Sequence, residues 1–111
     1  MVEEKRRYIR WERKVRVTYS FDQSDESSEG VFTENISEVG TQIITEDIFE
    51  LGQFVRIKFE FSSDSVPIIV DCRVVYVRSE KEGNRVGLQF IEIDEFQKER
   101  LIRCLMIASK E

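Results

Sequence analysis

Hydrophobic and polar side chains alternate along most of this chain, with the period of two that a half-buried β-strand requires. The strictest example lies over residues 54–61, where apolar side chains alternate with charged ones: Phe54 or Val55, Ile57, Phe59 and Phe61 against Arg56, Lys58 and Glu60. Shorter runs repeat this pattern. Together they predict six strands, over residues 15–19, 31–36, 41–45, 54–61, 68–78 and 85–91.

Polar, turn-rich segments separate these runs. Residues 20–30 are acidic and indicate a hairpin loop, and residues 62–65 and 80–84 indicate tight turns. Residues 47–52 form either a short helical turn or an irregular loop. About six short strands joined by such connections are typical of an antiparallel barrel or sandwich.

The period changes to that of a helix over residues 95–108. Asp94 is suited to the N-cap, and Gln97, three residues later, is suited to the capping box. An apolar stripe follows at helical spacing, formed by Leu101, Cys104, Leu105 and Ala108. We therefore expect one C-terminal helix that packs its stripe against the sheet.

Composition places this chain among globular domains, because 41% of its 111 residues are hydrophobic. Its charge is unevenly distributed: residues 1–19 carry seven basic and three acidic side chains, a net +4, and the remainder carries −9. A basic end on an acidic body favours a local anion site over a general nucleic-acid surface. Pairing of the basic end with the acidic body is the alternative.

The sequence contains no motif for catalysis, metal binding or a phosphate-binding loop. The chain contains no histidine, which excludes histidine-based triads and metal sites, and its five glycines form no phosphate loop. Cys72 and Cys104 are too far apart for a redox or zinc motif and are expected to be buried, reduced thiols. We predict no enzymatic activity, no catalytic residues, no cofactor and no metal. The charged N-terminus resembles no signal peptide and no segment is long enough to span a membrane, so we expect a cytoplasmic protein.

Two short motifs carry candidate binding chemistry. Arg6 and Arg10 share one face of an extended segment, about 13 Å apart at a rise of ~3.3 Å per residue. Their guanidinium groups suit phosphates, or guanine edges that expose paired acceptors. The second motif is Asn35-x-Ser37-x-x-Gly40, between two predicted strands. It is also a plain turn sequence, in which Gly40 would adopt a positive φ, and the arginines alone could be a solvated basic arm.

Both motifs together resemble the PilZ domain family, whose members carry R-x-x-x-R on an N-terminal arm and D/N-x-S-x-x-G on a barrel. The strand Val86-Gly87-Leu88-Gln89-Phe90, followed by a helix, is also similar. The resemblance covers roughly residues 4–108. It implies a mostly β fold: a six-stranded antiparallel β-barrel with a C-terminal α-helix. Residues 1–10 would form a flexible N-terminal arm, and residues 11–111 the single barrel domain.

The resemblance also implies the ligand, the bacterial second messenger cyclic di-GMP. Arg6 and Arg10, helped by Arg7, would bind guanine edges and phosphates. Asn35 and Ser37 would contact a guanine base, with Gly40 shaping the turn beneath it. The remaining implied ligand contact is Tyr76, at a strand position where many members carry an aromatic residue. Asn35 replaces the more frequent aspartate, so we expect binding with lower affinity.

The implied role is that of a receptor and adaptor. Ligand binding would order the N-terminal arm over the barrel and change a surface for a downstream protein partner. We expect a monomer or a ligand-dependent dimer, with no nucleic-acid partner and no membrane insertion. Two alternatives remain: a PilZ-like protein–protein interaction module without nucleotide binding, and an oligonucleotide-binding barrel. Acidic residues on the strands count against the second: Glu29, Glu34, Glu46, Glu60 and Asp71.

Overall fold

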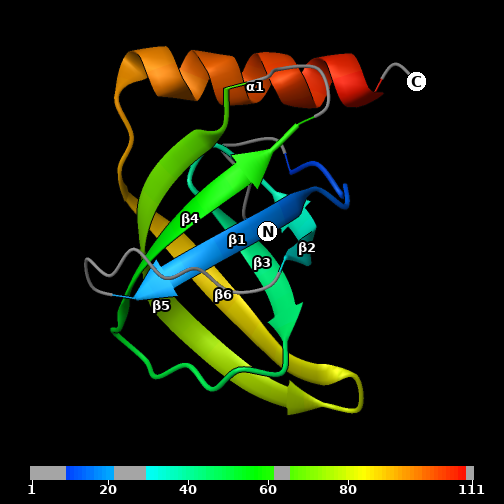
Figure 1. The fold of residues 1–111 in the computed structure, drawn as a ribbon, viewed down its shortest axis with the longest axis vertical. Helices are drawn as coiled ribbons and strands as arrows, with labels where there is room; N and C mark the ends of the chain where they lie inside the picture. Colours follow the sequence, from blue (N-terminus) through cyan, green and yellow to red (C-terminus); the bar gives the residue numbers. More distant parts are fainter. Residues whose placement is uncertain (1–9, 22–29, 62–65, 110–111) are drawn as a thin grey trace, which may run out of the picture.

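A computed structural model describes residues 10–21, 30–61 and 66–109 of the chain. Six antiparallel strands close into a barrel in the order β1-β2-β3-β6-β5-β4 (Figure 1). The strands are β1 (Arg16–Phe21), β2 (Val31–Ile36), β3 (Gly40–Thr45), β4 (Phe54–Glu60), β5 (Ile68–Glu80) and β6 (Gly83–Glu92). One helix follows, α1 (Glu95–Ser109). The predicted antiparallel barrel with a C-terminal helix is confirmed.

The barrel interior is filled by the apolar positions of the alternating strands. On β4, Val55, Ile57 and Phe59 are fully buried, and the intervening Arg56 is exposed. Of the two apolar residues that begin this run, Val55 occupies the inward position and Phe54 does not. Phe54 is only half-buried and pairs with the exposed Arg73 of β5.

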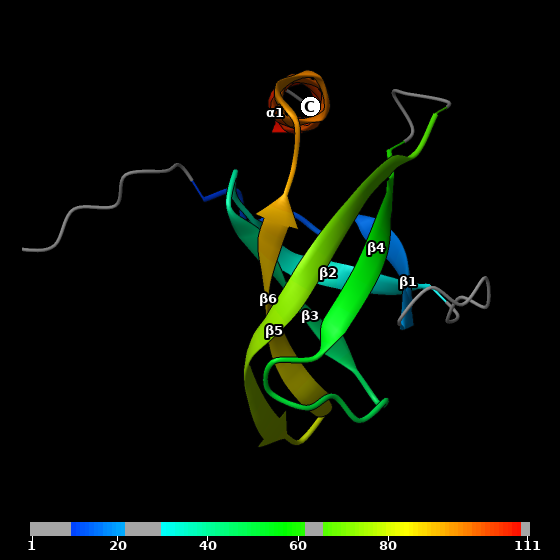
Figure 2. The same cartoon turned by 90° about the vertical axis from the view of Figure 1, so that its left-hand side faces the viewer.

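Helix α1 lies across one end of the barrel, as Figures 1 and 2 show. It begins after Asp94, whose Oδ1 accepts a hydrogen bond of 2.8 Å from the backbone N–H of Gln97. This confirms Asp94 as the N-cap. The Gln97 side chain accepts a hydrogen bond from Arg100 instead of completing a capping box. Leu101 and Leu105 of the predicted stripe are fully buried.

The opposite end of the barrel is closed by the connection between β3 and β4, which is an irregular loop (Figure 1). Phe49 points back into the core, and its ring centroid lies 5.2 Å from those of both Tyr19 and Phe21. Buried aromatic clusters of this kind contribute packing energy beyond their area. Among the described residues, α1 therefore covers one end of the barrel interior and the packing of Phe49 fills the other.

The two cysteines are free and buried, as the sequence predicted. Burial raises the pKa of the Cys72 thiol far above its usual range, with a smaller contribution from the charge of Asp71. A thiol with a raised pKa stays protonated and unreactive at neutral pH. Cys72 therefore acts as a small apolar core residue.

Candidate functional site

The chain enters the barrel beside the end of β2. Trp11 and Ile36 form an isolated antiparallel bridge, with hydrogen bonds of 2.7 Å from Trp11 N to Ile36 O and 2.8 Å in the reverse direction. This bridge places Arg10 next to the turn that follows Ile36. Arg10 is exposed, and within the described part of the chain its side chain makes no hydrogen bond or ion pair.

The turn between β2 and β3 is built from the second motif. The Ser37 backbone N–H donates to Gly40 O at 2.9 Å, and Ser37 Oγ accepts from the Val39 N–H at 3.1 Å. The expected positive φ at Gly40 is wrong, because among the described glycines only Gly52 and Gly83 have one. Glycine is needed at position 40 for a different reason: a Cβ there would collide with the backbone carbonyl oxygen of Leu88 on β6.

A β-bulge turns Asn35 toward the outside of the barrel. The register between β2 and β3 shifts between Thr33 and Asn35, so β2 carries one extra residue there. Thr33 and Ile36 are both buried inside the barrel, and the two residues between them are half-buried. The Asn35 side chain therefore contributes to the outer wall.

A second β-bulge turns Tyr76 toward the outside of the barrel. The register between β5 and β6 shifts between Val74 and Tyr76. Val74 is buried and Val77 packs against the core, so the residues between them belong to the outer face. The Tyr76 ring covers Gly87 of β6, where a Cβ would lie 2.5 Å from Cε2 of Tyr76. Gly87 thus makes room for the tyrosine ring on the barrel surface.

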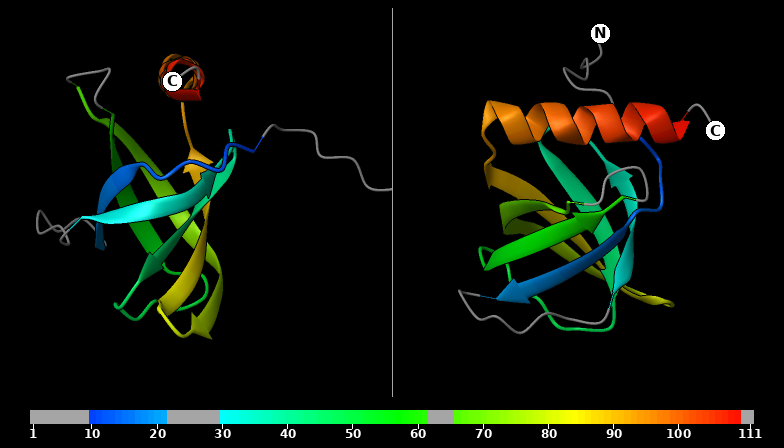
Figure 3. Two further views of the ribbon diagram at one scale, coloured as in Figure 1. Left: turned by 90° about the vertical axis from the view of Figure 1, so that its right-hand side faces the viewer. Right: turned by 45° about the horizontal axis from the view of Figure 1, so that its top comes forward.

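The two bulges place four residues in one row of cross-strand neighbours. Asn35 pairs with Gln42, Gln42 with Gly87, and Gly87 with Tyr76, across the strands β2, β3, β6 and β5. These strands lie side by side on one wall of the barrel (Figures 2 and 3). The row forms the floor of a groove of about 330 Å³, whose lining residues are Arg10, Asn35, Ser37, Val39, Gly40, Thr41, Gln42, Val75, Tyr76, Gly87, Leu88 and Gln89.

The structure therefore brings together five of the seven residues singled out in the sequence: Arg10, Asn35, Ser37, Gly40 and Tyr76. Arg6 and Arg7 lie outside the described residues. Sequence reasoning missed Gln42 and Gln89 as groove residues. A glycine inside a strand can mark a close approach, so Gly87 was the available signal for the tyrosine contact. No local signal identified Gln42, whose position follows from the register of three strands.

The groove has a distinctive charge. Among the described residues, its lining contains one cation, Arg10, and no carboxylate, although the chain as a whole carries a net charge of −5. Amide and hydroxyl groups supply the other polar contacts, and the Tyr76 ring and neighbouring aliphatic side chains supply apolar surface. This combination suits a ligand that carries both negative charge and flat, hydrogen-bonding rings.

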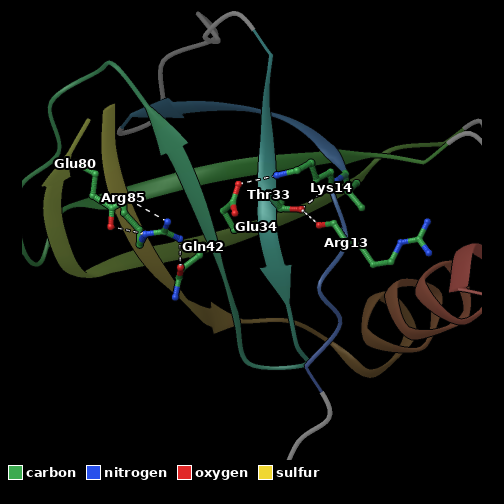
Figure 4. A network of polar contacts seen from close by, with 8 residues as sticks. Arg13, Lys14, Thr33, Glu34, Gln42, Glu80 and Arg85 are labelled. Carbon is green, nitrogen blue, oxygen red and sulfur yellow. Dashed lines mark hydrogen bonds and ion pairs between the residues drawn. The ribbon is translucent and has the colours of Figure 1, made fainter. Parts of the chain in front are cut away.

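A polar network borders the groove along β3 and β6 (Figure 4). Arg85 donates to Glu80 through Nε at 2.8 Å and Nη2 at 3.0 Å, and through Nη1 to Gln42 Oε1 at 3.0 Å. The hydrogen bond from Arg85 lowers the pKa of Glu80, and the same bond raises the pKa of Arg85. Both groups are therefore charged at neutral pH.

A second depression of about 400 Å³ lies beside the groove and shares Asn35 with it. Its charged residues balance, with Glu12 and Glu34 against Lys14 and Arg85. Lys14 is already paired with Glu34 at 2.8 Å. An anionic ligand therefore gains less here than in the neighbouring groove, where Arg10 has no such competitor among the described residues.

Fold and groove together describe a small β-barrel domain with a groove on its outer wall. The family model of the PilZ domain matches residues 4–106. This chain belongs to the PilZ domain family. No curated protein sequence matches it.

Solved structures of PilZ proteins share the fold. The PilZ domain of YcgR from Escherichia coli, solved with cyclic di-GMP, has a TM-score of 0.74 at 12% identity, over 96% of this chain and 93% of that chain. The inhibitor of motility MotI (DgrA) from Bacillus subtilis has a TM-score of 0.77 at 18% identity. The match covers 98% of this chain and 53% of MotI, so this chain spans about half the length of that protein.

In the part of the chain that the structure describes, no helix is long and apolar enough to cross a membrane.

Proposed function

We propose that this protein is a bacterial cyclic di-GMP receptor that acts as an adaptor on a protein partner. The observation that carries the proposal is the groove, whose described lining residues combine one cation, several neutral hydrogen-bonding groups and an aromatic ring, without a carboxylate. Cyclic di-GMP offers two phosphates and two guanine bases to such a lining. The YcgR domain solved with cyclic di-GMP has the same fold and adds support.

In this proposal each groove residue has a chemical role. Arg10 binds a phosphate or the O6 and N7 edge of a guanine, which match the fork of a guanidinium group. Asn35 and Ser37 hydrogen-bond one guanine base, and Tyr76 provides a flat apolar surface beside it. Gly40 keeps the turn close enough to β6 for these contacts.

Arg6 and Arg7 lie outside the described residues but precede Arg10 by only a few positions. We propose that ligand binding draws residues 1–10 over the groove and so alters the surface that a partner protein contacts. Ordering costs about 1–2 kcal/mol for each fixed residue, which the charge-assisted hydrogen bonds have to exceed. Hydrogen exchange tests this step: amides of the arm should exchange more slowly with cyclic di-GMP. Equal exchange with and without ligand would rule out the switch while leaving binding intact.

Calorimetric titration tests the receptor itself. Cyclic di-GMP should bind the wild-type protein saturably, whereas GTP, which carries a single guanine and a linear triphosphate, should bind much more weakly. An absence of binding heat for cyclic di-GMP, supported by an unchanged melting temperature, would overturn the receptor function. The chain would then be an interaction module of the same family without a nucleotide.

Replacing Asn35 with aspartate should tighten cyclic di-GMP binding by up to about tenfold. The carboxylate can accept two guanine N–H groups, and hydrogen bonds to a charged group contribute about 1.5–3 kcal/mol against about 0.5–1.5 kcal/mol for neutral pairs. Competition against a labelled nucleotide would measure the change, with the melting temperature of the free variant as a check on folding. Equal or weaker binding by the variant would show that Asn35 does not contact these donors.

A further inference from the structure

The groove contains a residue whose hydrogen-bonding direction is fixed by the protein. Gln42 is the direct cross-strand partner of Asn35 and is half-buried on the groove floor. Opposite residues on paired strands lie about 5 Å apart, so a base that contacts Asn35 also lies within reach of Gln42. The properties of the Gln42 amide therefore affect which base can occupy this position.

Arg85 determines which end of the Gln42 amide faces the ligand. A guanidinium group has donors only, so its hydrogen bond of 3.0 Å to Gln42 requires the amide oxygen on the Arg85 side. Arg85 is itself held by Glu80 through two hydrogen bonds (Figure 4). Such bidentate pairs restrict the guanidinium orientation as well as its position. The amide of Gln42 is thus oriented by a charged pair outside the groove floor.

The amide nitrogen of Gln42 is the end that remains for a ligand. Within residues 10–21, 30–61 and 66–109, Nε2 makes no hydrogen bond. With its oxygen occupied, Gln42 can offer the groove two N–H donors and little accepting capacity. It therefore favours a base edge that presents acceptors.

We propose that Gln42 is a specificity-determining residue that selects guanine over adenine, and that Arg85 is the positioning residue that sets its direction. This inference rests on the proposed cyclic di-GMP function. Guanine presents acceptors at O6 and N7, whereas adenine has an amino donor in place of O6. A donor facing a donor leaves both groups unpaired in a partly desolvated site, which weakens adenine binding.

The first test compares cyclic di-GMP with cyclic di-AMP on the full chain and on Gln42→Glu. Glutamate keeps an acceptor for Arg85 at nearly the same size, but it replaces the amide nitrogen by an accepting oxygen. The ratio of the two affinities should shift toward cyclic di-AMP by about tenfold or more. Arg85→Met should lower the preference for cyclic di-GMP by about threefold to tenfold, because the amide is then free to rotate.

Arg78→Met is the matched control. Arg78 also pairs with Glu80, at 2.9 Å, but it makes no hydrogen bond to Gln42 in the described structure. This variant removes the same charge from the same network and should keep the wild-type ratio. A wild-type ratio in both Gln42→Glu and Arg85→Met would overturn this inference and leave the receptor function standing. A wild-type protein that binds neither nucleotide would overturn the receptor function as well.

Discussion

Replacing Arg10 with alanine should weaken cyclic di-GMP binding by about a hundredfold. Arg10 is the only charged residue in the groove lining of the described structure, and the Trp11–Ile36 bridge fixes its position beside Asn35 and Ser37. Two charge-assisted hydrogen bonds from its guanidinium group, each contributing about 1.5 kcal/mol, account for a change of this size. Calorimetry of the variant would measure it directly.

Arg103→Ala is the matched control for this loss. Arg103 lies on the exposed side of helix α1, outside the groove lining, and its replacement removes the same charge. Long-range attraction of the nucleotide would weaken equally in both variants, whereas a direct contact weakens only in Arg10→Ala. Affinities that fall together, or an Arg10→Ala variant that binds as tightly as wild type, would place the nucleotide outside this groove. Thermal unfolding should be nearly unchanged in both.

Gly40→Ala should impair both stability and binding. The added methyl group meets the carbonyl oxygen of Leu88, a backbone atom that cannot move without shifting β6. Overpacking of this kind costs about 1–3 kcal/mol in the free energy of unfolding. The turn from Ser37 to Gly40 has to move away from β6, so Ser37 and Asn35 lose their places in the groove. Urea unfolding would measure the first effect, and titration with cyclic di-GMP the second.

Gly52→Ala separates these two effects. Gly52 has a φ of 82°, and a Cβ there would touch no atom within 4 Å. The left-handed backbone alone makes alanine unfavourable by about 1 kcal/mol. We expect this variant to lose stability and to retain the wild-type affinity. If Gly40→Ala also retained the wild-type affinity, the turn would not form part of the nucleotide site.

Local periodicity was sufficient to predict the strands and the helix, whereas the choice of a barrel over a sandwich came from the family resemblance. The strands alternate their apolar residues because one face of each wall is buried, and the helix repeats Leu101, Cys104 and Leu105 along one stripe. Asp94 could be predicted as the N-cap because its hydrogen bond to the Gln97 N–H spans only three residues. All of these features depend on neighbours close in the sequence. They therefore leave a pattern that can be read without the fold.

The features that could not be predicted from the sequence depend on the register between neighbouring strands. The bulges beside Asn35 and Tyr76 shift the inward–outward alternation, so a strict period of two misplaces side chains beyond them. Phe54 involves no such shift, because the period of two, counted back from Ile57 and Phe59, already gives Val55 the inward position on β4. Gly40 was identified correctly but for the wrong cause, since the carbonyl of Leu88 belongs to a strand far along the chain.

The groove depends both on a local sequence motif and on the register between strands. Its turn is a local motif, and Ser37 and Gly40 could be recognised from their spacing. Gln42 belongs to the site only because β3 lies between β2 and β6 in the closed barrel. The charged pair that orients Gln42 likewise joins residues from β5 and β6. The motif was therefore enough to predict where the site lies, whereas the remaining residues of the site follow from the register of the barrel strands.

The most direct test of the central proposal is a map of the amide nitrogen–proton correlation spectrum during titration with cyclic di-GMP. Binding in the groove should shift the amides of Ser37, Gly40, Gln42, Tyr76 and Gly87 together and to saturation. These residues come from the turn after β2 and from the three strands β3, β5 and β6, so only a ligand on this wall of the barrel can perturb them all. Shifts that cluster on helix α1 or at the loop around Phe49, or a spectrum that does not change, would contradict the account.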